Sequence, residues 1–306
     1  MPILINMISD LKNALAHDLG ANRILHEEPL AKHCNWRAGG PGDLLLIVRT
    51  TDELVKAVAR AKAHSVPFTL IGFGANVLVS DRGIRGLVIL NRAHRIEFLS
   101  DSIVETDSGT NLAVLAKACA QHGVGGLEFL IGIPGTVGAA VAVNAGTRTE
   151  WISTIVSSVK VLPRRGELAW LEPAELAFSY RSSRLKHTDE VVITARLLGK
   201  PDNLKYIVEK MAQHLKVRKN QPTGPSAGSV FKNPEGDFAG RLIEACGLKG
   251  FKVGGAEVSN MHANFILNTG TATATDIKNV IAHVKREVKK VFGVALEEEI
   301  RYLGEW

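Results

Sequence analysis

Two glycine-rich segments constrain the fold of this chain more than any other feature of its sequence. The first reads IGFGANVLVSD over residues 71–81, and the second reads GLEFLIGIPGTVGAAVAVNAG over residues 126–146. Glycine allows tight turns and lets a backbone come close to another chain or to a bound anion. Taken alone, the first segment is typical of a plain turn. The second fits a tightly packed sheet corner and a ligand-binding loop equally well.

The spacing of these glycines argues against two common nucleotide-binding motifs. After Gly72 and Gly74, Val77 stands where a G-x-G-x-x-G fingerprint needs its third glycine, and the residues that follow are strand-like. A Rossmann-type dinucleotide site is therefore a poor match. Neither segment carries a Walker lysine. Together, the two segments favour a large phosphate-bearing cofactor that lies between two small units.

The composition is that of a globular protein with a substantial core, and it allows several anionic partners. The 306 residues suffice for two or three small domains, with 45% hydrophobic and 22% charged residues. The net charge of +6 is compatible with nucleic acid, an acidic membrane face or a small polyanion. However, the densest basic stretch (residues 283–290) spaces its charges as a solvated helix face does. We therefore expect a small anionic substrate, without nucleic acid.

The cysteines and apolar stretches predict a cytoplasmic protein without a metal site. Three widely separated cysteines show no metal-ligand spacing, and an odd, sparse number favours a reducing compartment. Asp10 and Lys12 interrupt the apolar N-terminal pattern, which argues against a signal peptide. The longest apolar region, residues 124–146, contains Glu128, Pro134 and many glycines, so we expect no membrane contact.

Periodicity predicts an α+β chain with at least two units. Helices are expected over residues 7–19, from the Thr50 cap to about 64, and over 111–122, 202–217 and 237–246, with a long last helix capped by Thr275. Strands are expected at 66–72, 87–90, 103–107, within 155–197, and at 264–270 and 295–304. In the last strand, Glu297, Glu299 and Arg301 alternate with apolar residues. The Pro/Gly/Ser segment 221–228 predicts a domain boundary.

Seven motifs occur along the chain in an order that matches one known family. Besides the two glycine-rich segments, they are RAGGPGDLLLIV (37–48), YRSSRLK (180–186), SAGSVFKNP (226–234), the block 239–270 and LEEEIRYLG (296–304). From about residue 30 to its end, the chain resembles the UDP-N-acetylenolpyruvoylglucosamine reductases, also called UDP-N-acetylmuramate dehydrogenases. Its short length resembles the second type of this family, which lacks a tyrosine-bearing substrate loop.

The resemblance implies a fold and a reaction. The fold is the two-subdomain FAD-binding fold of the PCMH/vanillyl-alcohol-oxidase type, followed by a C-terminal α+β substrate-binding domain. The implied domains are residues 1–82 with 293–306, residues 83–218, and residues 219–292. In the implied reaction, NADPH reduces non-covalently bound FAD. UDP-N-acetylglucosamine enolpyruvate then receives a hydride on its terminal vinyl carbon and a proton on the adjacent carbon, which gives UDP-N-acetylmuramate for peptidoglycan synthesis.

The same resemblance assigns three catalytic residues. Ser229 is the implied proton donor, and Arg181 and Glu299 are implied to hold and polarise the substrate carboxylate. These residue types suit the chemistry, because hydride addition beside a carboxylate builds negative charge that a cation or a hydrogen-bond donor must meet. Each also has a structural interpretation: a turn hydroxyl, an exposed ion pair and a solvated glutamate.

The resemblance also implies a set of binding residues. The expected FAD contacts are Arg37, Gly72, Phe73, Gly74, Ala75, Asn76, Val77, Gly132, Ile133, Pro134, Gly135, Thr136, Gly138, Ala139, Asn144, Ala145 and Gly146. The expected substrate contacts are Lys232, Asn233, His262 and, from a looser match, Lys219. A capped turn before Pro234 and a core histidine are the structural alternatives. We expect a monomer.

Four departures from the family pattern are visible. Ala75 replaces a usual serine, Ala139 a usual glycine, Val143 a usual methionine and Glu298 a common proline. A missing hydroxyl at Ala75 costs about 0.5–1.5 kcal/mol of cofactor binding, which is too little to abolish it. Glu298 places a charge on the mostly apolar side of the last strand.

Two rival functions remain open from the sequence. One is another FAD-dependent sugar or lactone oxidoreductase on the same scaffold, although these lack GSVFKNP. The other is a non-catalytic flavin or UDP-sugar binding paralogue, against which the retained Arg181, Ser229 and Glu299 argue.

Overall fold

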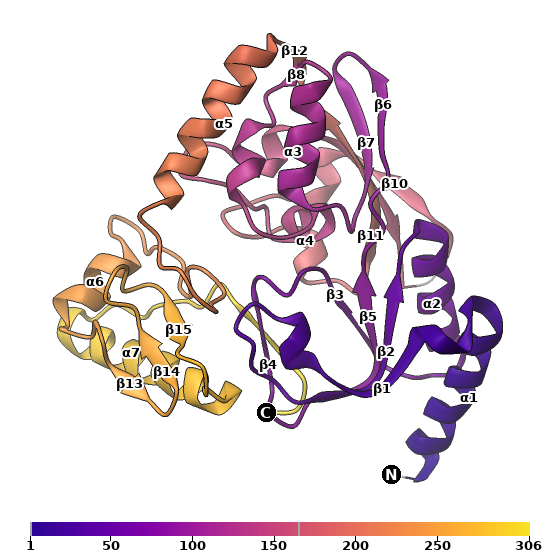
Figure 1. Cartoon of the computed structure of the whole chain (residues 1–306), viewed down its shortest axis with the longest axis horizontal. Coiled ribbons are helices and arrows are strands. Elements are labelled where there is room, and N and C mark those ends of the chain that lie inside the picture. The colour runs from indigo at the N-terminus through magenta and orange to yellow at the C-terminus, as the bar shows by residue number, and fades with distance from the viewer. Residues whose placement is uncertain (1, 165) are drawn as a thin grey trace.

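The computed structural model describes residues 2–164 and 166–306. Helices and strands are mixed throughout, which confirms the expected α+β class. Figure 1 shows three groups of elements: the N-terminal elements in indigo and purple, the middle of the chain in magenta to orange, and the C-terminal elements in orange and yellow.

The N-terminal group is a four-stranded sheet covered on one face by two helices. Its strands are β1 (Ile24–Pro29), β2 (Pro41–Val48), β3 (Phe68–Ile71) and β5 (Ile84–Asn91), in the order β1-β2-β5-β3. The helices are α1 (Pro2–Leu19) and α2 (Thr51–Ala63). Alternate residues of β2 and β5, such as Leu44 and Leu87, pack against these helices. The expected Thr50 cap is confirmed, because its side chain accepts a hydrogen bond from the Glu53 N–H.

The middle group is a five-stranded antiparallel sheet with helices around it. The sheet order is β10-β9-β11-β7-β6, formed by β6 (Ile96–Ser100), β7 (Ile103–Asp107), β9 (Val156–Leu162), β10 (Ala169–Leu171) and β11 (Val191–Leu198). The helices are α3 (Leu112–Gln121), α4 (Val137–Ala142) and α5 (Leu204–Arg218), and β8 (Val124–Gly125) pairs with β12 (Lys200–Pro201). The short helix α4 lies inside the second glycine-rich segment and begins where the Thr136 side chain accepts from the Ala139 N–H.

The C-terminal group packs two helices against a small sheet. Its elements are α6 (Ala239–Ala245), β13 (Lys252–Val253), β14 (Ala256–Val258), β15 (Ile266–Asn268) and α7 (Ala274–Phe292). The expected cap of α7 at Thr275 is wrong. Thr273 is the cap, because its side chain accepts from the Asp276 N–H while the Asp276 carboxylate accepts from the Thr273 N–H. Thr275 lies in the first turn, and its hydroxyl donates to Asp81 instead.

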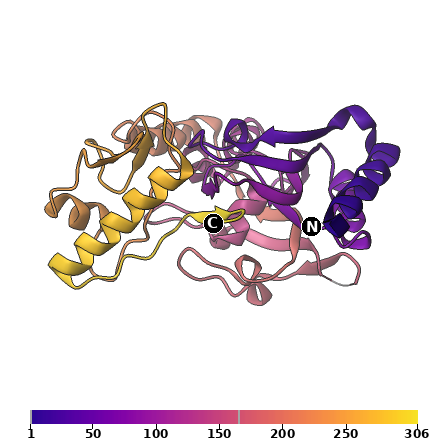
Figure 2. The same ribbon diagram turned by 90° about the horizontal axis from the view of Figure 1, so that it is seen from below.

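The chain end returns to the N-terminal group, as Figure 2 shows for the segment after α7. There β16 (Arg301–Leu303) pairs in parallel with β4 (Val77–Val79), directly after the first glycine-rich turn. The strand expected over 295–304 is therefore shorter than predicted. Residues 297–299 instead bond to residues 230–232, which places the serine motif beside the chain end.

Short 3-10 helices complete the described elements: Ala21–Arg23, Leu30–His33, Glu128–Gly132, Ile152–Thr154, Pro173–Leu176 and Arg184–Lys186. Among the residues that the structure describes, no helix combines the length and the apolar character needed to cross a membrane.

Candidate functional site

A cavity of about 920 Å³ lies between the N-terminal and middle groups, and both glycine-rich segments line it. Its volume is near the upper end of the roughly 300–1,000 Å³ that ligand pockets span. Thirteen of the expected FAD contacts line this cleft: Gly72, Phe73, Gly74, Ala75, Asn76, Val77, Ile133, Pro134, Gly135, Thr136, Gly138, Ala139 and Ala145.

The glycines explain how this cleft is built. A Cβ atom at Gly72 would lie 2.8 Å from Thr136 Oγ1, so only glycine lets the first loop come this close to the start of α4. Gly135 has a φ of 135°, and a Cβ there would meet no described atom within 4 Å. Gly72 therefore lets the two loops pack against each other, and Gly135 leaves space open in the cleft. The size, the apolar lining and this open cradle fit a cofactor as large as FAD.

Four expected FAD contacts lie outside the lining of this cleft. Asn144 is buried, and its side chain donates to the Ser179 carbonyl at 2.9 Å and accepts from the Ser153 N–H at 3.2 Å. The Gly146 carbonyl accepts from Arg181, and a Cβ at Gly132 would contact Arg218. The fourth, Arg37, lies elsewhere.

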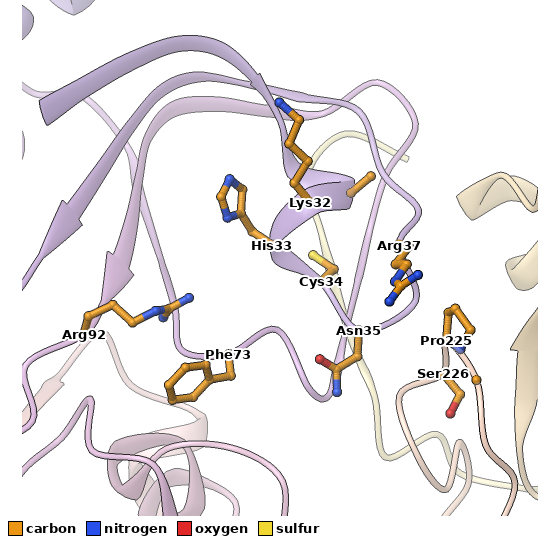
Figure 3. A pocket seen from close by; sticks show the side chains of 11 residues that line it. Lys32, His33, Cys34, Asn35, Arg37, Phe73, Arg92, Pro225 and Ser226 are labelled. Atoms are coloured by element: carbon orange, nitrogen blue, oxygen red, sulfur yellow. The ribbon is translucent and has the colours of Figure 1, made fainter. Parts of the chain in front are cut away.

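Arg37 lines a second cavity of about 820 Å³, which Figure 3 shows from close by. Pro225 and Ser226 lie on the side nearest to Arg37, and Arg92 and Phe73 lie across from it. The Arg92 guanidinium donates to the Gly72 carbonyl at 2.7 Å and lies 4.4 Å from the centre of the Phe73 ring. Because Phe73 lines both cavities, the second cavity adjoins the cleft.

An ion pair joins two of the three expected catalytic residues. Arg181 Nε lies 3.2 Å from Glu299 Oε1, although Arg181 follows β10 and Glu299 precedes β16. The Arg181 guanidinium also donates to the Gly146 carbonyl at 3.1 Å and lies 5.3 Å from the centre of the Trp151 ring. Arg181 thus links the second glycine-rich segment to the end of the chain.

Burial sets the electrostatics of Glu299. Its side chain is 18% exposed, and burial raises its pKa, while Arg181, Lys186 and Lys232 oppose the rise. The carboxyl group therefore keeps its proton to a higher pH than a solvated glutamate does. Such a group is able to donate a hydrogen bond to an anionic ligand.

Ser229 lies next to this pair through its backbone. Val230 directly follows Ser229, and its carbonyl accepts from the Glu299 N–H at 2.8 Å. On the other side, Ser229 forms a bridge with Phe265. The structure therefore brings Arg181, Ser229 and Glu299 into one region, where the three groups of elements meet.

The expected substrate contacts are divided between this region and other places. Lys232 is largely buried and forms an ion pair with Glu297. The side chain of Asn233 accepts from the Ala239 N–H at the start of α6, as a capping residue does. Lys219 is exposed just after α5.

His262 contacts the protein itself. Its Nδ1 accepts from the Asn264 N–H at 3.2 Å, and it packs against Gly240. Burial lowers the pKa of His262, which keeps the ring neutral and able to accept this hydrogen bond.

Four cationic residues that line the cleft are not among the expected contacts: Lys62, Arg164, Lys186 and Arg301. Two of them lie beside the expected site. Lys186 donates to the Arg181 carbonyl at 3.3 Å, and burial lowers its pKa. The Arg301 N–H donates to the Asn76 carbonyl at 3.0 Å, which places this residue beside the first loop. Lys186 stands in the motif YRSSRLK and Arg301 in LEEEIRYLG, where Glu299 and Arg301 alternate with apolar residues. That alternation was the signal available.

Glu298, which stands where the family commonly has proline, forms an ion pair in the structure. Lys285 on α7 lies 2.5 Å from its carboxylate. The charge on the apolar side of the segment is therefore neutralised by a cation from the neighbouring helix.

Comparison with known proteins gives two family matches. The FAD binding domain family matches residues 42–172, and the C-terminal domain of UDP-N-acetylenolpyruvoylglucosamine reductase matches residues 219–303. The UDP-N-acetylenolpyruvoylglucosamine reductase of Moorella thermoacetica is 44% identical over 285 residues, which are 92% of this chain and 94% of that protein. The enzyme of the same name from Desulforamulus reducens is 42% identical over 91% of this chain and 93% of its own.

A solved structure agrees with these relatives. The crystal structure of UDP-N-acetylenolpyruvylglucosamine reductase from Thermus caldophilus has a TM-score of 0.78 and 35% identity, covering 92% of this chain and 98% of that one. Together with the FAD binding domain match, this confirms the expected FAD-binding fold with a C-terminal reductase domain. The chain belongs to the UDP-N-acetylenolpyruvoylglucosamine reductase family.

Proposed function

We propose that this protein is an FAD-dependent enzyme that uses NADPH to reduce UDP-N-acetylglucosamine enolpyruvate to UDP-N-acetylmuramate for peptidoglycan synthesis. The observation that carries the proposal is the Arg181–Glu299 ion pair beside the Ser229 segment, next to the cleft that both glycine-rich loops line. Family membership supports the same substrate.

The cleft residues of the two loops would hold the FAD, with Arg301 and Lys186 as further cations at its wall. Bound FAD, reduced by NADPH, would supply the hydride for this reaction. The side chains of the protein would bind the substrate and deliver the proton.

Arg181 and Glu299 would hold the substrate carboxylate. The guanidinium is permanently charged and offers several donors, so it suits a carboxylate whose negative charge grows during the reaction. Burial raises the pKa of Glu299 and so favours the protonated form, in which the carboxyl group would donate a hydrogen bond to the same carboxylate. The substrate carboxylate would bind beside the ion pair that these two side chains form in the structure.

Ser229 would protonate the carbon next to the carboxylate. A serine hydroxyl is a weak acid in water, so it needs a basic acceptor and a fixed position. The backbone bridge to Phe265 and the Val230–Glu299 hydrogen bond support such a position. As the new C–H bond forms, the Ser229 O–H bond breaks.

We assign the diphosphate of the substrate to one cationic and one amide side chain near this region. Lys232 and Asn233 follow Ser229 in sequence, and Tyr180 Oη lies 3.4 Å from the Asn233 N–H. We also propose His262 and Lys219 as more distant contributors.

The domain division proposed is residues 1–82 with 293–306, residues 83–218, and residues 219–292. The return of β16 to β4 supports joining the chain end to the first unit. We further propose a monomer in the cytoplasm. The three cysteines are free thiols, as a reducing compartment favours.

Colour and half-reactions test the proposed function. Purified protein should be yellow with releasable FAD, and NADPH without air should bleach it. Adding the enolpyruvyl UDP-sugar should restore the colour and form one UDP-N-acetylmuramate per flavin. Oxygen consumption with simple sugars, and no reoxidation by the UDP-sugar, would instead favour a sugar oxidase.

A further inference from the structure

The segment that carries Ser229 is the middle strand of a small three-stranded arrangement. On one side lies the Glu299 segment, with hydrogen bonds of 2.8 Å from the Glu299 N–H to the Val230 carbonyl and from the Lys232 N–H to the Glu297 carbonyl. On the other side lie Asn264 and Phe265, just before β15. Whatever fixes this middle strand also fixes the Ser229 hydroxyl relative to the Glu299 carboxyl.

Asn264 makes three of the bonds that hold this strand. Its carbonyl accepts from the Val230 N–H at 2.9 Å. Its side-chain amide accepts from the Phe231 N–H at 2.9 Å and donates to the Phe231 carbonyl at 2.8 Å. One side chain thus satisfies both polar backbone groups of a residue that stands two positions after Ser229.

This amide is rigid and shielded from water. Asn264 is 4% exposed and Phe231 is 2% exposed, so water cannot replace the missing bonds if the amide is altered. The Asn264 N–H is itself held by His262 Nδ1, on the same loop. The titratable groups along this strand and the segment beside it are Lys232, Glu297, Glu298 and Glu299.

We propose that Asn264 is a positioning residue for proton delivery: its side-chain amide clamps Phe231 and so holds the Ser229 hydroxyl in line with the substrate carbon. The inference rests on the proposed function. It adds a residue that touches neither cofactor nor substrate, and it assigns to that residue the second half-reaction alone.

Asn264→Asp is the sharpest test, because the clamp in this variant depends on protonation. The new carboxyl group, when ionised, still accepts from the Phe231 N–H but repels the Phe231 carbonyl. When protonated, the same group donates to that carbonyl and restores both bonds. Burial should raise the pKa of this carboxyl well above about 4, so it should titrate within the range of about pH 5 to 8.

The readout is the rate of each half-reaction, measured by stopped flow across that pH range and divided by the wild-type rate. At about pH 8, reoxidation by the UDP-sugar should fall by about 10- to 100-fold, since misplacement near 1 Å costs up to about 100-fold. At about pH 5.5 most of the loss should disappear, because the carboxyl group is then protonated. Flavin reduction by NADPH should stay within about twofold of the wild type, because Ser229 takes no part in it.

Two further variants keep the test decisive. Asn264→Gln keeps both amide functions on a longer side chain, so it should slow reoxidation without recovery at low pH; it also serves if Asn264→Asp does not fold. Asn268→Asp is the matched control. Asn268 is equally buried and holds the Trp36 carbonyl at 2.8 Å, so this change should lower stability without altering the ratio of the half-reactions.

Equal losses in both half-reactions, or an Asn264→Asp loss that does not change with pH, would overturn the positioning role. If NADPH reduces the wild-type protein but the UDP-sugar does not reoxidise it, the proposed function is wrong instead. The two failures are therefore distinguishable.

Discussion

Ser229 is held by the backbone around it and not by its own side chain. Among residues 2–164 and 166–306, no hydrogen bond joins its hydroxyl to another residue, while its backbone is bridged to Phe265. The side chain is partly exposed. A fixed residue with an unengaged hydroxyl is the arrangement that a proton donor to a bound ligand needs.

Ser229→Ala should separate the two half-reactions. Flavin reduction by NADPH should persist, and reoxidation by the UDP-sugar should fall by about 100- to 10,000-fold, the range that a general acid contributes. Stopped-flow absorbance of the flavin measures both. Ser226→Ala, in the same segment, is the control and should leave both rates unchanged; wild-type reoxidation in Ser229→Ala would remove this serine from the mechanism.

Glu299→Gln should change how stability depends on pH. Because burial raises the folded-state pKa of Glu299 above its ordinary 4.5, its protonated form favours folding. That contribution is full below about pH 4.5 and is lost as the pH rises through the raised pKa. Glutamine does not titrate, so the variant does not lose stability in this way. In urea unfolding, the free energy of unfolding of the variant minus that of the wild type should therefore increase from about pH 4 to about pH 7.

If the variant instead became less stable than the wild type as the pH rises, the ion pair with Arg181 would have a larger effect on the pKa of Glu299 than burial does. Activity gives an independent readout of the same substitution. Reoxidation by the UDP-sugar should slow, because glutamine carries no ionisable proton to share with the substrate carboxylate.

At the scale of elements, helix starts follow from local hydrogen bonds that the sequence displays. The spacing of Thr50 and Glu53 predicts a helix start at Thr50, and a helix is expected from Asn111; both side chains accept from N–H groups of the first turn. Thr275 was chosen wrongly. Thr273 and Thr275 both precede the same pattern. Thr273 is the cap because it exchanges two capping bonds with Asp276, three residues later, whereas the Thr275 hydroxyl donates to Asp81, far along the chain.

The start of α2 also carries an ion pair that should depend on pH. Glu53 accepts from Arg23 at 2.6 and 2.7 Å, and this bond, the largest cause, lowers the pKa of Glu53 to about 2. A lowered pKa stabilises the fold above about pH 4.5, and the effect is lost as the pH falls towards about 2.

Glu53→Gln should therefore destabilise the protein at about pH 7 by less than about 1 kcal/mol, because the pair is partly exposed. The difference from the wild type should shrink on acidification. Thermal unfolding at about pH 7 and about pH 3 measures it. A difference that grows as the pH falls would show that Glu53 acts through its packing and not through its charge.

At the scale of the whole molecule, Trp36 joins the first group of elements to the last. It is fully buried among C-terminal residues such as Val258 and Ile277, and its indole N–H donates to the Ile266 carbonyl at 2.8 Å. Asp81 adds a second link, because its carboxylate accepts from the Ala274 and Thr275 N–H groups at the start of α7. The C-terminal group is thus fixed to the N-terminal group beside the cleft.

Replacing Trp36 should show how much this link contributes. Trp36→Ala should lower the free energy of unfolding by about 3–5 kcal/mol, as large-to-small changes in a core do. Trp36→Phe should cost about 1–3 kcal/mol, because it leaves the Ile266 carbonyl without its donor. Urea unfolding measures both, with the partly exposed Trp306→Phe as a control expected within about 0.5 kcal/mol.

The sequence alone determined the α+β class, the two loops that line the cleft, and the identity of the residues in the region where Arg181, Ser229 and Glu299 meet. The class and the loops follow from apolar periodicity and glycine spacing, and the three residues follow from the resemblance of their motifs to a known family. All of these signals are local in the chain. The sequence did not show that Asn144 is tied to the Ser179 backbone or that Arg37 lines a second cavity.

Only the tertiary structure decided which distant groups meet. The Arg181–Glu299 pair spans 118 residues of chain, and the clamp of Asn264 on Phe231 spans 33. Such contacts arise when packed units bring their edges together, and no local pattern encodes them. Their burial then sets the charge state of Glu299 and the rigidity of the Ser229 strand, because a polar group without water must find its partner in the protein.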